Sequence, residues 1–278
     1  MDLKLSEIKI PPLPTVTIKV MLFDITDPAN GIHELEKLIN PDKGITSELL
    51  RIANSAFYGR SGSVKNLRDA ITLMGIKTVK NLVILQSTKN IAARLKGDVY
   101  KTHLQILSIL TALIAFDLGT PLGFKKTRED LFLCGLLHKI GMTILAVNYP
   151  KEYQELLKDS ESGDKTLLAL ETEKLGINFI ELSLKVFEFW KIPQMLADVV
   201  AAQTFSKEEI SKVSDNDRLV RLADILARKM LSLHVSPEIE ELELALFKHY
   251  EAPEELINLF HTDYFENIQD HPFFELAT

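Results

Sequence analysis

Residues 127–147, TREDLFLCGLLHKIGMTILAV, decide the fold class. Thr127 stands at a typical N-cap position, and Glu129 and Asp130 follow in the first turn, where the helix dipole favours carboxylates. Apolar residues fill most of the remaining positions, and Pro150 ends the segment. The stretch therefore predicts one apolar helix that carries the adjacent pair His138 and Lys139.

Helical periodicity extends along almost the whole chain. In residues 77–95 the apolar side chains recur at spacings of three and four, and Gly97 follows as a helix terminator. The same reasoning predicts further helices near residues 15–26, 33–39, 45–55, 67–74 and 99–118. No alternating strand pattern occurs, so the sequence predicts an all-α fold.

Composition narrows the class of protein. With 46% hydrophobic and 26% charged side chains in 278 residues, the chain has enough apolar surface for a globular core. The longest run without a charged residue or histidine, 104–116, is too short to cross a bilayer, and the N-terminus lacks the pattern of a signal peptide. Cys134 is the one cysteine, so no internal disulfide can form. We expect a cytoplasmic protein that has no membrane segment and carries Cys134 in its core.

Charge is unevenly distributed. Residues 251–278 contain seven acidic residues and no lysine or arginine, so this acidic tail holds the entire net charge of −7. Residues 51–96 contain nine basic residues against Asp69 alone. The basic segment could face an external anion or the acidic tail of the same chain. Intramolecular docking of the tail is therefore a hypothesis of the sequence.

Four cations near two aromatic residues raise a second binding hypothesis. Phe57 and Tyr58 lie among Arg51, Arg60, Lys65 and Arg68, a mixture that could bind phosphates while a ring stacks on a base. The alternative is a solvated basic face beside a packed loop. The net acidity and the spacing of four residues between Ala70 and Gly75 disfavour a DNA-binding helix-turn-helix, so nucleic acid is not an expected partner.

Polar side chains on apolar helices are the candidates for chemistry. His103, His138 and Asp224 each lie on a predicted helix with apolar neighbours, and together they could form part of a metal site that activates water. The alternative is that neighbouring groups in the core satisfy them. No phosphate-binding GxxxxGK[ST] loop, GxSxG nucleophile elbow or GxGxxG fingerprint occurs, so those classes of enzyme are disfavoured.

Several motifs together resemble one family. The segments PPLPTVTIKVMLFDITDP (11–28), RIANSAFYG (51–59) and LRDAITLMG (67–75), followed by residues 131–153, resemble the HDOD family, signalling relatives of the HD-domain phosphohydrolases, over roughly residues 10–205. The resemblance implies a two-lobed helical HD-like fold. It places an N-terminal helical lobe at 1–97, an HD-like lobe at 98–205 and a C-terminal helical extension with the acidic tail at 206–278. It also implies protein partners in bacterial signalling.

The resemblance further implies which residues correspond to HD metal ligands. His103 matches the first histidine, His138 the second, and Asp224 lies near the position of the final aspartate. At other positions where relatives carry metal ligands, the chain has different residues. Lys139 replaces the aspartate that should follow His138. These departures predict a vestigial site without metal or cofactor.

Two further ligand positions are also replaced. Phe179 stands where relatives often have histidine, and Gln203 lies where a pair of histidines is common. An ammonium in place of a ligand carboxylate would repel a metal ion by about 4 kcal/mol at about 4 Å and an effective dielectric constant of about 20. Lys139 could instead pair with Asp224, with His103 and His138 as neutral partners, or it could point to solvent.

We therefore expect a noncatalytic signal-transduction protein that regulates or scaffolds through protein contacts. One alternative is a metal-dependent phosphohydrolase or phosphodiesterase with a divergent HD site. A second is a nucleotide-sensing module without turnover. The sequence shows no attached cyclic-dinucleotide synthase or receiver domain, so partners are expected to meet the chain in trans.

Overall fold

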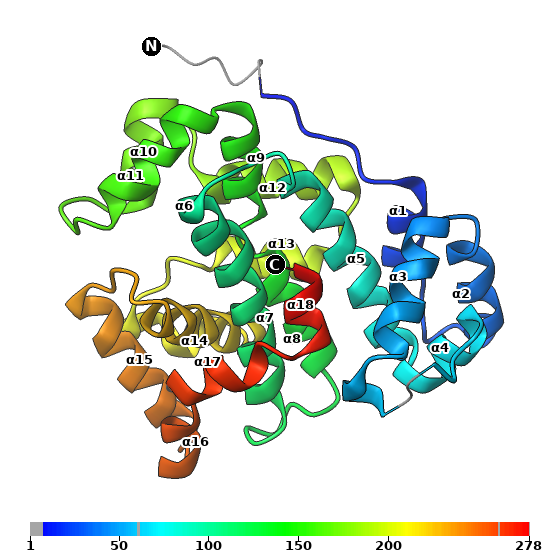
Figure 1. Ribbon diagram of the computed structural model, residues 1–278. Coiled ribbons are helices and arrows are strands. Elements are labelled where there is room, and N and C mark those ends of the chain that lie inside the picture. The colour runs from blue at the N-terminus through cyan, green and yellow to red at the C-terminus, as the bar shows by residue number, and fades with distance from the viewer. Residues whose placement is uncertain (1–7, 60–61, 261, 278) are drawn as a thin grey trace.

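The structure, a computed structural model, describes residues 8–59, 62–260 and 262–277. Helices joined by turns and short loops make up these residues, and no strand occurs among them (Figure 1). The predicted all-α fold class is confirmed.

An N-terminal lobe, blue to cyan in Figure 1, stands at one side of the molecule. Its elements are α1 (Thr15–Met21), α2 (Ile32–Ile39), α3 (Lys43–Ala53), the 3₁₀ turn η2 (Ala56–Tyr58), α4 (Leu67–Met74) and α5 (Ile76–Ala92). The side chains of Asp42 and Asn66 cap α3 and α4 by accepting hydrogen bonds from Ile45 N and Asp69 N. The predicted helix at 15–26 ends early because the Asp24 side chain binds the Thr26 N–H and forms a turn.

The central helices follow directly in the chain and share the apolar core with the N-terminal lobe. They are α6 (Asp98–Tyr100), the π-helical segment η3 (Lys101–Ile106), α7 (Leu107–Gly119), α8 (Arg128–Leu137), α9 (Ile140–Asn148), α10 (Pro150–Ser160), α11 (Leu167–Leu175), α12 (Phe179–Trp190) and α13 (Gln194–Ala201). Helices α7 and α8 approach closely at Gly135, where an added Cβ would lie 2.8 Å from the Ala112 Cα. Only glycine fits at such a contact between two backbones.

The last elements return to this core. They are the 3₁₀ segment η4 (Lys207–Lys212), α14 (Asp215–Met230), α15 (Pro237–His249), α16 (Glu254–Leu259), α17 (Thr262–Ile268) and α18 (Pro272–Ala277). Ser214 and Asp217 form a capping box at the start of α14, which packs directly on α7 and α8. Helix α14 therefore shares the core of residues 98–205, and the predicted domain limits remain a prediction.

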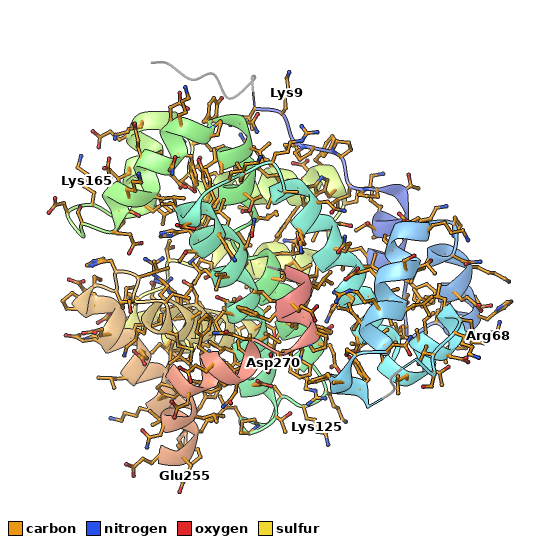
Figure 2. The ribbon with its side chains drawn as sticks, in the orientation of Figure 1. Lys9, Arg68, Lys125, Lys165, Glu255 and Asp270 are labelled. Carbon is orange, nitrogen blue, oxygen red and sulfur yellow. The ribbon has the colours of Figure 1, made fainter. Side chains whose placement is uncertain are left out.

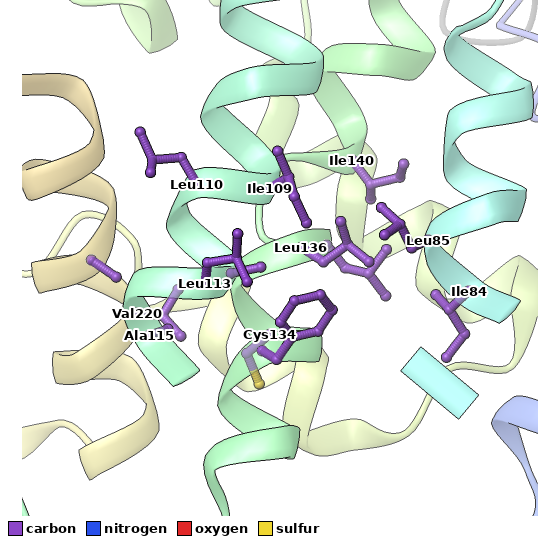
Figure 3. Packing of buried hydrophobic residues seen from close by; sticks show 14 of the residues in the cluster. Ile84, Leu85, Ile109, Leu110, Leu113, Ala115, Cys134, Leu136, Ile140 and Val220 are labelled. Carbon is purple, nitrogen blue, oxygen red and sulfur yellow. The ribbon is translucent and has the colours of Figure 1, made fainter. Parts of the chain in front are cut away.

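One continuous apolar core joins the lobes. Figure 3 shows side chains of α5, α7, α8 and α14 around Cys134, which is buried as predicted. Burial raises the pKa of its thiol well above the ordinary value. Two described segments, Asp98–Gly119 and Arg128–Asn148, are apolar and long enough to span a membrane by length and composition alone. Most of their residues are buried inside the protein, as in core helices of a folded domain.

The acidic tail docks on the basic N-terminal segment. Helices α17 and α18, red in Figure 1, run past α7 and α8 until α18 contacts α5. Arg51 Nη1 lies 2.6 Å from Glu275 Oε1, and the rings of Phe132 and Phe273 pack edge to face at 5.2 Å. The hypothesis of intramolecular docking is confirmed. Both the apolar residues and the charges of the tail take part: apolar side chains of α18 are buried, and one ion pair joins the described tail to residues 51–96.

Candidate functional site

The predicted helix of residues 127–147 is broken at its polar pair. Helix α8 ends at Leu137, α9 begins at Ile140, and Lys139 has φ −122° and ψ 25°, outside the helical region. Two residues later Gly141 lies against α12, where an added Cβ would be 2.1 Å from the Phe179 carbonyl oxygen. The prediction of one continuous helix is thus wrong, because the contact with α12 and the position of Lys139 require a turn.

His138 is fully buried at this turn. Its Nδ1 lies 2.6 Å from the Gly135 carbonyl oxygen, which can only accept, so Nδ1 carries the proton. The unprotonated Nε2 faces Asp224 Oδ1 at 3.3 Å. Burial lowers the pKa of His138 despite the neighbouring carboxylate, so the ring is neutral at pH 7. This orientation, with Nδ1 bonded to a backbone carbonyl, is the one that histidine adopts as a metal ligand.

Lys139 and Asp224 form a buried ion pair. The Lys139 Nζ lies 2.5 Å from Asp224 Oδ1, and the two side chains are 8% and 1% exposed. Burial would raise the pKa of Asp224, but the charge of Lys139 holds it well below the ordinary value. Burial lowers the pKa of Lys139 to about 8 against the attraction of Asp224. Both groups are charged at neutral pH, so the predicted pairing is confirmed and the solvent-facing alternative for Lys139 is wrong.

His103 belongs to a different cluster. It is buried in η3, and its Nδ1 lies 3.8 Å from Glu161 Oε1, too far for a hydrogen bond. Burial lowers its pKa to about 4, while Glu161 acts in the opposite direction. His103 is neutral, as predicted, but it does not bind Asp224: Glu161 faces it instead, and Arg228 Nη2 lies 3.5 Å from the same Oε1.

A cleft of about 330 Å³ brings four of the six predicted positions together. Lys139, Phe179, Gln203 and Asp224 all line it, between α11, α14 and the start of α15. Phe179 N donates a hydrogen bond of 2.8 Å to Glu171, and Gln203 Nε2 donates one of 3.0 Å to the Val199 carbonyl. Four positions that are far apart in the sequence are therefore adjacent in the fold.

The sequence did not find Glu171 or the arginines of α14. Glu171 is buried and accepts hydrogen bonds from Tyr153 Oη at 2.5 Å and from Phe179 N. Burial raises its pKa to about 7, although both hydrogen bonds act to lower it. Arg221 and Arg228 line the cleft on the same helical face as Asp224. A charged residue within the apolar pattern LLALETEKL was the available signal for Glu171.

A metal ion does not fit these side chains. The Lys139 ammonium is in contact with the carboxylate oxygen that would serve as a ligand. Within residues 8–59, 62–260 and 262–277, no three His, Cys, Asp or Glu side chains are placed to hold a metal ion. A mixture of one carboxylate, one imidazole and an ammonium is not a ligand set for a divalent cation.

Three of the four cations predicted to bind an anion, Arg51, Lys65 and Arg68, lie among the described residues. Arg51 pairs with Glu48 and Glu275, and Arg68 pairs with Glu36 at 2.8 Å. Figure 2 shows Arg68 at the outer edge of the N-terminal lobe. Lys65 is exposed, and Arg60 lies outside the described residues. Two of the four residues thus already have carboxylate partners. Anion binding by the four residues remains a prediction.

Comparison with known proteins identifies the family. A family model for the HDOD domain matches residues 10–205. The chain belongs to the HDOD family. The match includes His103, His138, Lys139, Phe179 and Gln203, whereas Asp224 and both arginines of the cleft lie beyond it.

Solved structures share the fold of this HDOD protein. An HDOD domain protein of unknown function from Geobacter sulfurreducens has a TM-score of 0.74 at 17% identity, with 96% of this chain and 92% of that chain covered. A Shewanella amazonensis SB2B protein described as a candidate phosphohydrolase has a TM-score of 0.70 at 18% identity, with 96% and 95% covered. A Marinobacter aquaeolei VT8 protein described as a candidate signal transduction protein has a TM-score of 0.70 at 18% identity, with 100% and 61% covered.

An uncharacterized protein of Treponema pallidum (strain Nichols) is 22% identical over 198 residues. The similarity covers 69% of this chain but 37% of that protein. The chain thus spans little more than a third of this curated relative.

Proposed function

We propose that this HDOD protein is a cytoplasmic, noncatalytic regulator of signal transduction that acts through protein contacts. The observation that carries the proposal is the 2.5 Å contact between Lys139 Nζ and Asp224 Oδ1. An internal cation neutralises the carboxylate that a catalytic metal would need. Phe179 and Gln203 add no anionic ligand to the cleft.

The docked tail suggests how protein contacts could be controlled. Leu276 of α18 is buried and, with Ile45, Leu49, Ile52 and Leu82, lines a small pocket between α18 and the N-terminal lobe. A partner helix with a similar apolar face would compete with α18 for this surface. Release of the tail would then couple partner binding to exposure of α3 and α5.

Metal content and hydrolysis test the noncatalytic assignment. Elemental mass spectrometry of the purified protein should find no stoichiometric transition metal. Bis(p-nitrophenyl) phosphate and p-nitrophenyl phosphate should not be hydrolysed with added Mn²⁺, Mg²⁺ or Ni²⁺. The variant Lys139→Asp should gain metal affinity because it restores a ligand carboxylate, whereas Lys158→Asp on the exposed face of α10 should not.

Stoichiometric metal in the parent protein together with ester hydrolysis would contradict the proposal. It would favour the alternative of a metal-dependent phosphohydrolase with a divergent site.

A further inference from the structure

The cleft has more cationic than anionic side chains. Its described lining includes Lys139, Lys165, Arg221 and Arg228 but one carboxylate, Asp224. Lys139 is paired with that carboxylate, and Arg228 Nη2 donates a hydrogen bond of 2.8 Å to the His234 carbonyl. Lys165 Nζ lies 2.6 Å from Glu173 Oε2, outside the lining. Arg221 is thus the cation of the described lining that has no acidic side chain at hydrogen-bond distance.

Arg221 is the cation of the described cleft lining whose Nε lacks a hydrogen-bond partner. Its side chain is 15% exposed, and its Nη1 lies 3.7 Å from Asp224 Oδ2, beyond hydrogen-bond distance. The Nε is buried and has no partner among the described residues. A buried guanidinium nitrogen without an acceptor is costly for the fold, so a ligand oxygen that accepts a hydrogen bond from the Arg221 Nε would be stabilised.

Two buried acceptors face the same cleft. Gln203 is 2% exposed and Asp224 is 1% exposed, yet Gln203 Oε1 and Asp224 Oδ2 have no hydrogen-bond donor within the described chain. The cleft therefore offers a planar donor group and two acceptors at once. A ligand that satisfies all three needs an oxyanion and, at other positions, hydroxyl or amino groups.

The rest of the lining is largely apolar. It includes Met142, Leu167, Leu168, Phe179, Ile225 and Ile239. A volume of about 330 Å³ with an apolar wall and a few convergent polar groups is characteristic of a site for a small organic molecule. An inorganic anion alone would leave the apolar wall and the acceptors unused.

We propose that the cleft binds a phosphorylated ligand of mononucleotide size, whose phosphate accepts hydrogen bonds from the Arg221 guanidinium. The planar fork of arginine matches two phosphate oxygens. Ribose hydroxyl or base amino groups donate to Gln203 Oε1 and Asp224 Oδ2. The base packs on the apolar wall. The inference rests on the proposed function in one respect, since it assigns binding without turnover.

Binding can be tested by calorimetric titration of the full chain with nucleoside monophosphates, ribose 5-phosphate, adenosine and inorganic phosphate. At least one nucleoside monophosphate should bind more tightly than inorganic phosphate and raise the melting temperature. Arg221→Gln should weaken that binding at least tenfold. The matched control Arg68→Gln, at the far edge of the N-terminal lobe, should leave it unchanged (Figure 2).

The stability of the variant provides an independent readout. Without ligand, Arg221→Gln should melt close to the temperature of the parent, because the loss of the charge 3.7 Å from Asp224 Oδ2 is offset by the removal of a buried Nε that has no partner. If this variant does not fold, Gln203→Met serves instead and should also weaken nucleotide binding.

Each outcome separates the two proposals. No binding of any nucleoside monophosphate at millimolar concentration, equal affinity for inorganic phosphate, or binding that Arg221→Gln leaves intact would overturn the ligand assignment, while the noncatalytic function would stand. Binding with release of phosphate, followed by ³¹P NMR, would overturn the noncatalytic function but support the site.

Discussion

The N-terminal lobe and the rest of the molecule bury different kinds of side chains. In residues 8–59 and 62–97, the buried polar side chains are Thr17, Asn81 and Ser87, and none of the described ones is charged or a histidine. In the described residues from 98 onward, the buried charged or histidine side chains are His103, His138, Lys139, Glu171, Asp217, Arg218, Asp224 and Glu243.

The difference shows where packing alone does not explain the sequence. Burying a charge costs free energy unless a partner compensates it. Even a paired charge in the core often stabilises a fold no more than an apolar side chain of similar volume would. The N-terminal lobe is a helical scaffold that apolar contacts suffice to build. Of these buried groups, Lys139 and Asp224 line the cleft, where the proposed ligand would bind.

The largest expected effect comes from breaking the buried pair. Lys139→Met leaves Asp224 ionised and buried without its cation, and should lower the free energy of unfolding by about 3–5 kcal/mol. Urea denaturation measures the change. The double variant Lys139→Met/Asp224→Leu should recover most of the loss, because an apolar pair needs no compensation.

The matched change in the N-terminal lobe is Lys80→Met. Lys80 is partly buried on α5 and donates a hydrogen bond to the Phe23 carbonyl, so its loss should cost about 1 kcal/mol. If Lys80→Met and Lys139→Met lowered the free energy of unfolding equally, buried charge would matter no more near the cleft than in the N-terminal lobe.

Glu171, which is buried on α11, should give the stability of the fold a distinctive pH dependence. Its folded-state pKa of about 7 exceeds the ordinary value of 4.5, so between these pH values the folded protein retains a proton that the unfolded chain has lost. The contribution to stability is therefore full below pH 4.5 and is lost as the pH rises through 7, by about 3 kcal/mol. His103, with a lowered pKa, contributes in the opposite direction between pH 4 and 6.5.

Comparison of parent and Glu171→Gln isolates the first effect. The variant should lack the fall in stability between pH 4.5 and 7, while Glu48→Gln in the N-terminal lobe serves as control. Identical pH profiles for parent and Glu171→Gln would mean that the Glu171 carboxyl is not protonated in the fold.

Local pattern predicted the scaffold better than the site. The helix at residues 67–74 has the bounds of α4, because its apolar spacing and cap are encoded within eight residues. The turn at Lys139 was missed, because it depends on Asp224, 85 residues away, and on the contact of Gly141 with α12. Lys139 shows no local sign of a helix break.

Only the residues of the site that correspond to positions of the family motif were predicted. His138, Lys139 and Asp224 were expected at one site, and they meet there. Arg221 and Glu171 carry no motif, and their importance arises from burial, which depends on how α11 and α14 pack. Helical spacing from Asp224 places Arg221 on the same face of α14. Only the fold shows that neighbouring helices bury this face.

A smaller effect should come from the hydroxyl pair in the N-terminal lobe. Ser87 Oγ donates to the Val83 carbonyl at 3.0 Å, so Thr17 Oγ1 donates to Ser87 Oγ at 2.6 Å. Ser87→Ala leaves the Thr17 donor unpaired and should cost about 1–2 kcal/mol, whereas Thr17→Val leaves Ser87 bonded and should cost less than about 1 kcal/mol. Thermal and urea unfolding of both variants test this order. A loss above about 3 kcal/mol for Ser87→Ala would show that the lobe depends on polar burial as strongly as the cleft does.

The smallest effect is expected where the two regions meet at the tail. Arg51 and Glu275 are 47% and 58% exposed, so a double-mutant cycle with Arg51→Gln and Glu275→Gln should give a coupling of about 0.2–1 kcal/mol. The coupling should fall further at about 1 M salt, where the screening length is about 3 Å. A coupling above about 2 kcal/mol that salt does not change would mean that charge holds the tail. The expected result instead assigns docking to the buried side chains of α18, so that a partner with an apolar face, rather than a change in ionic strength, is what would release it.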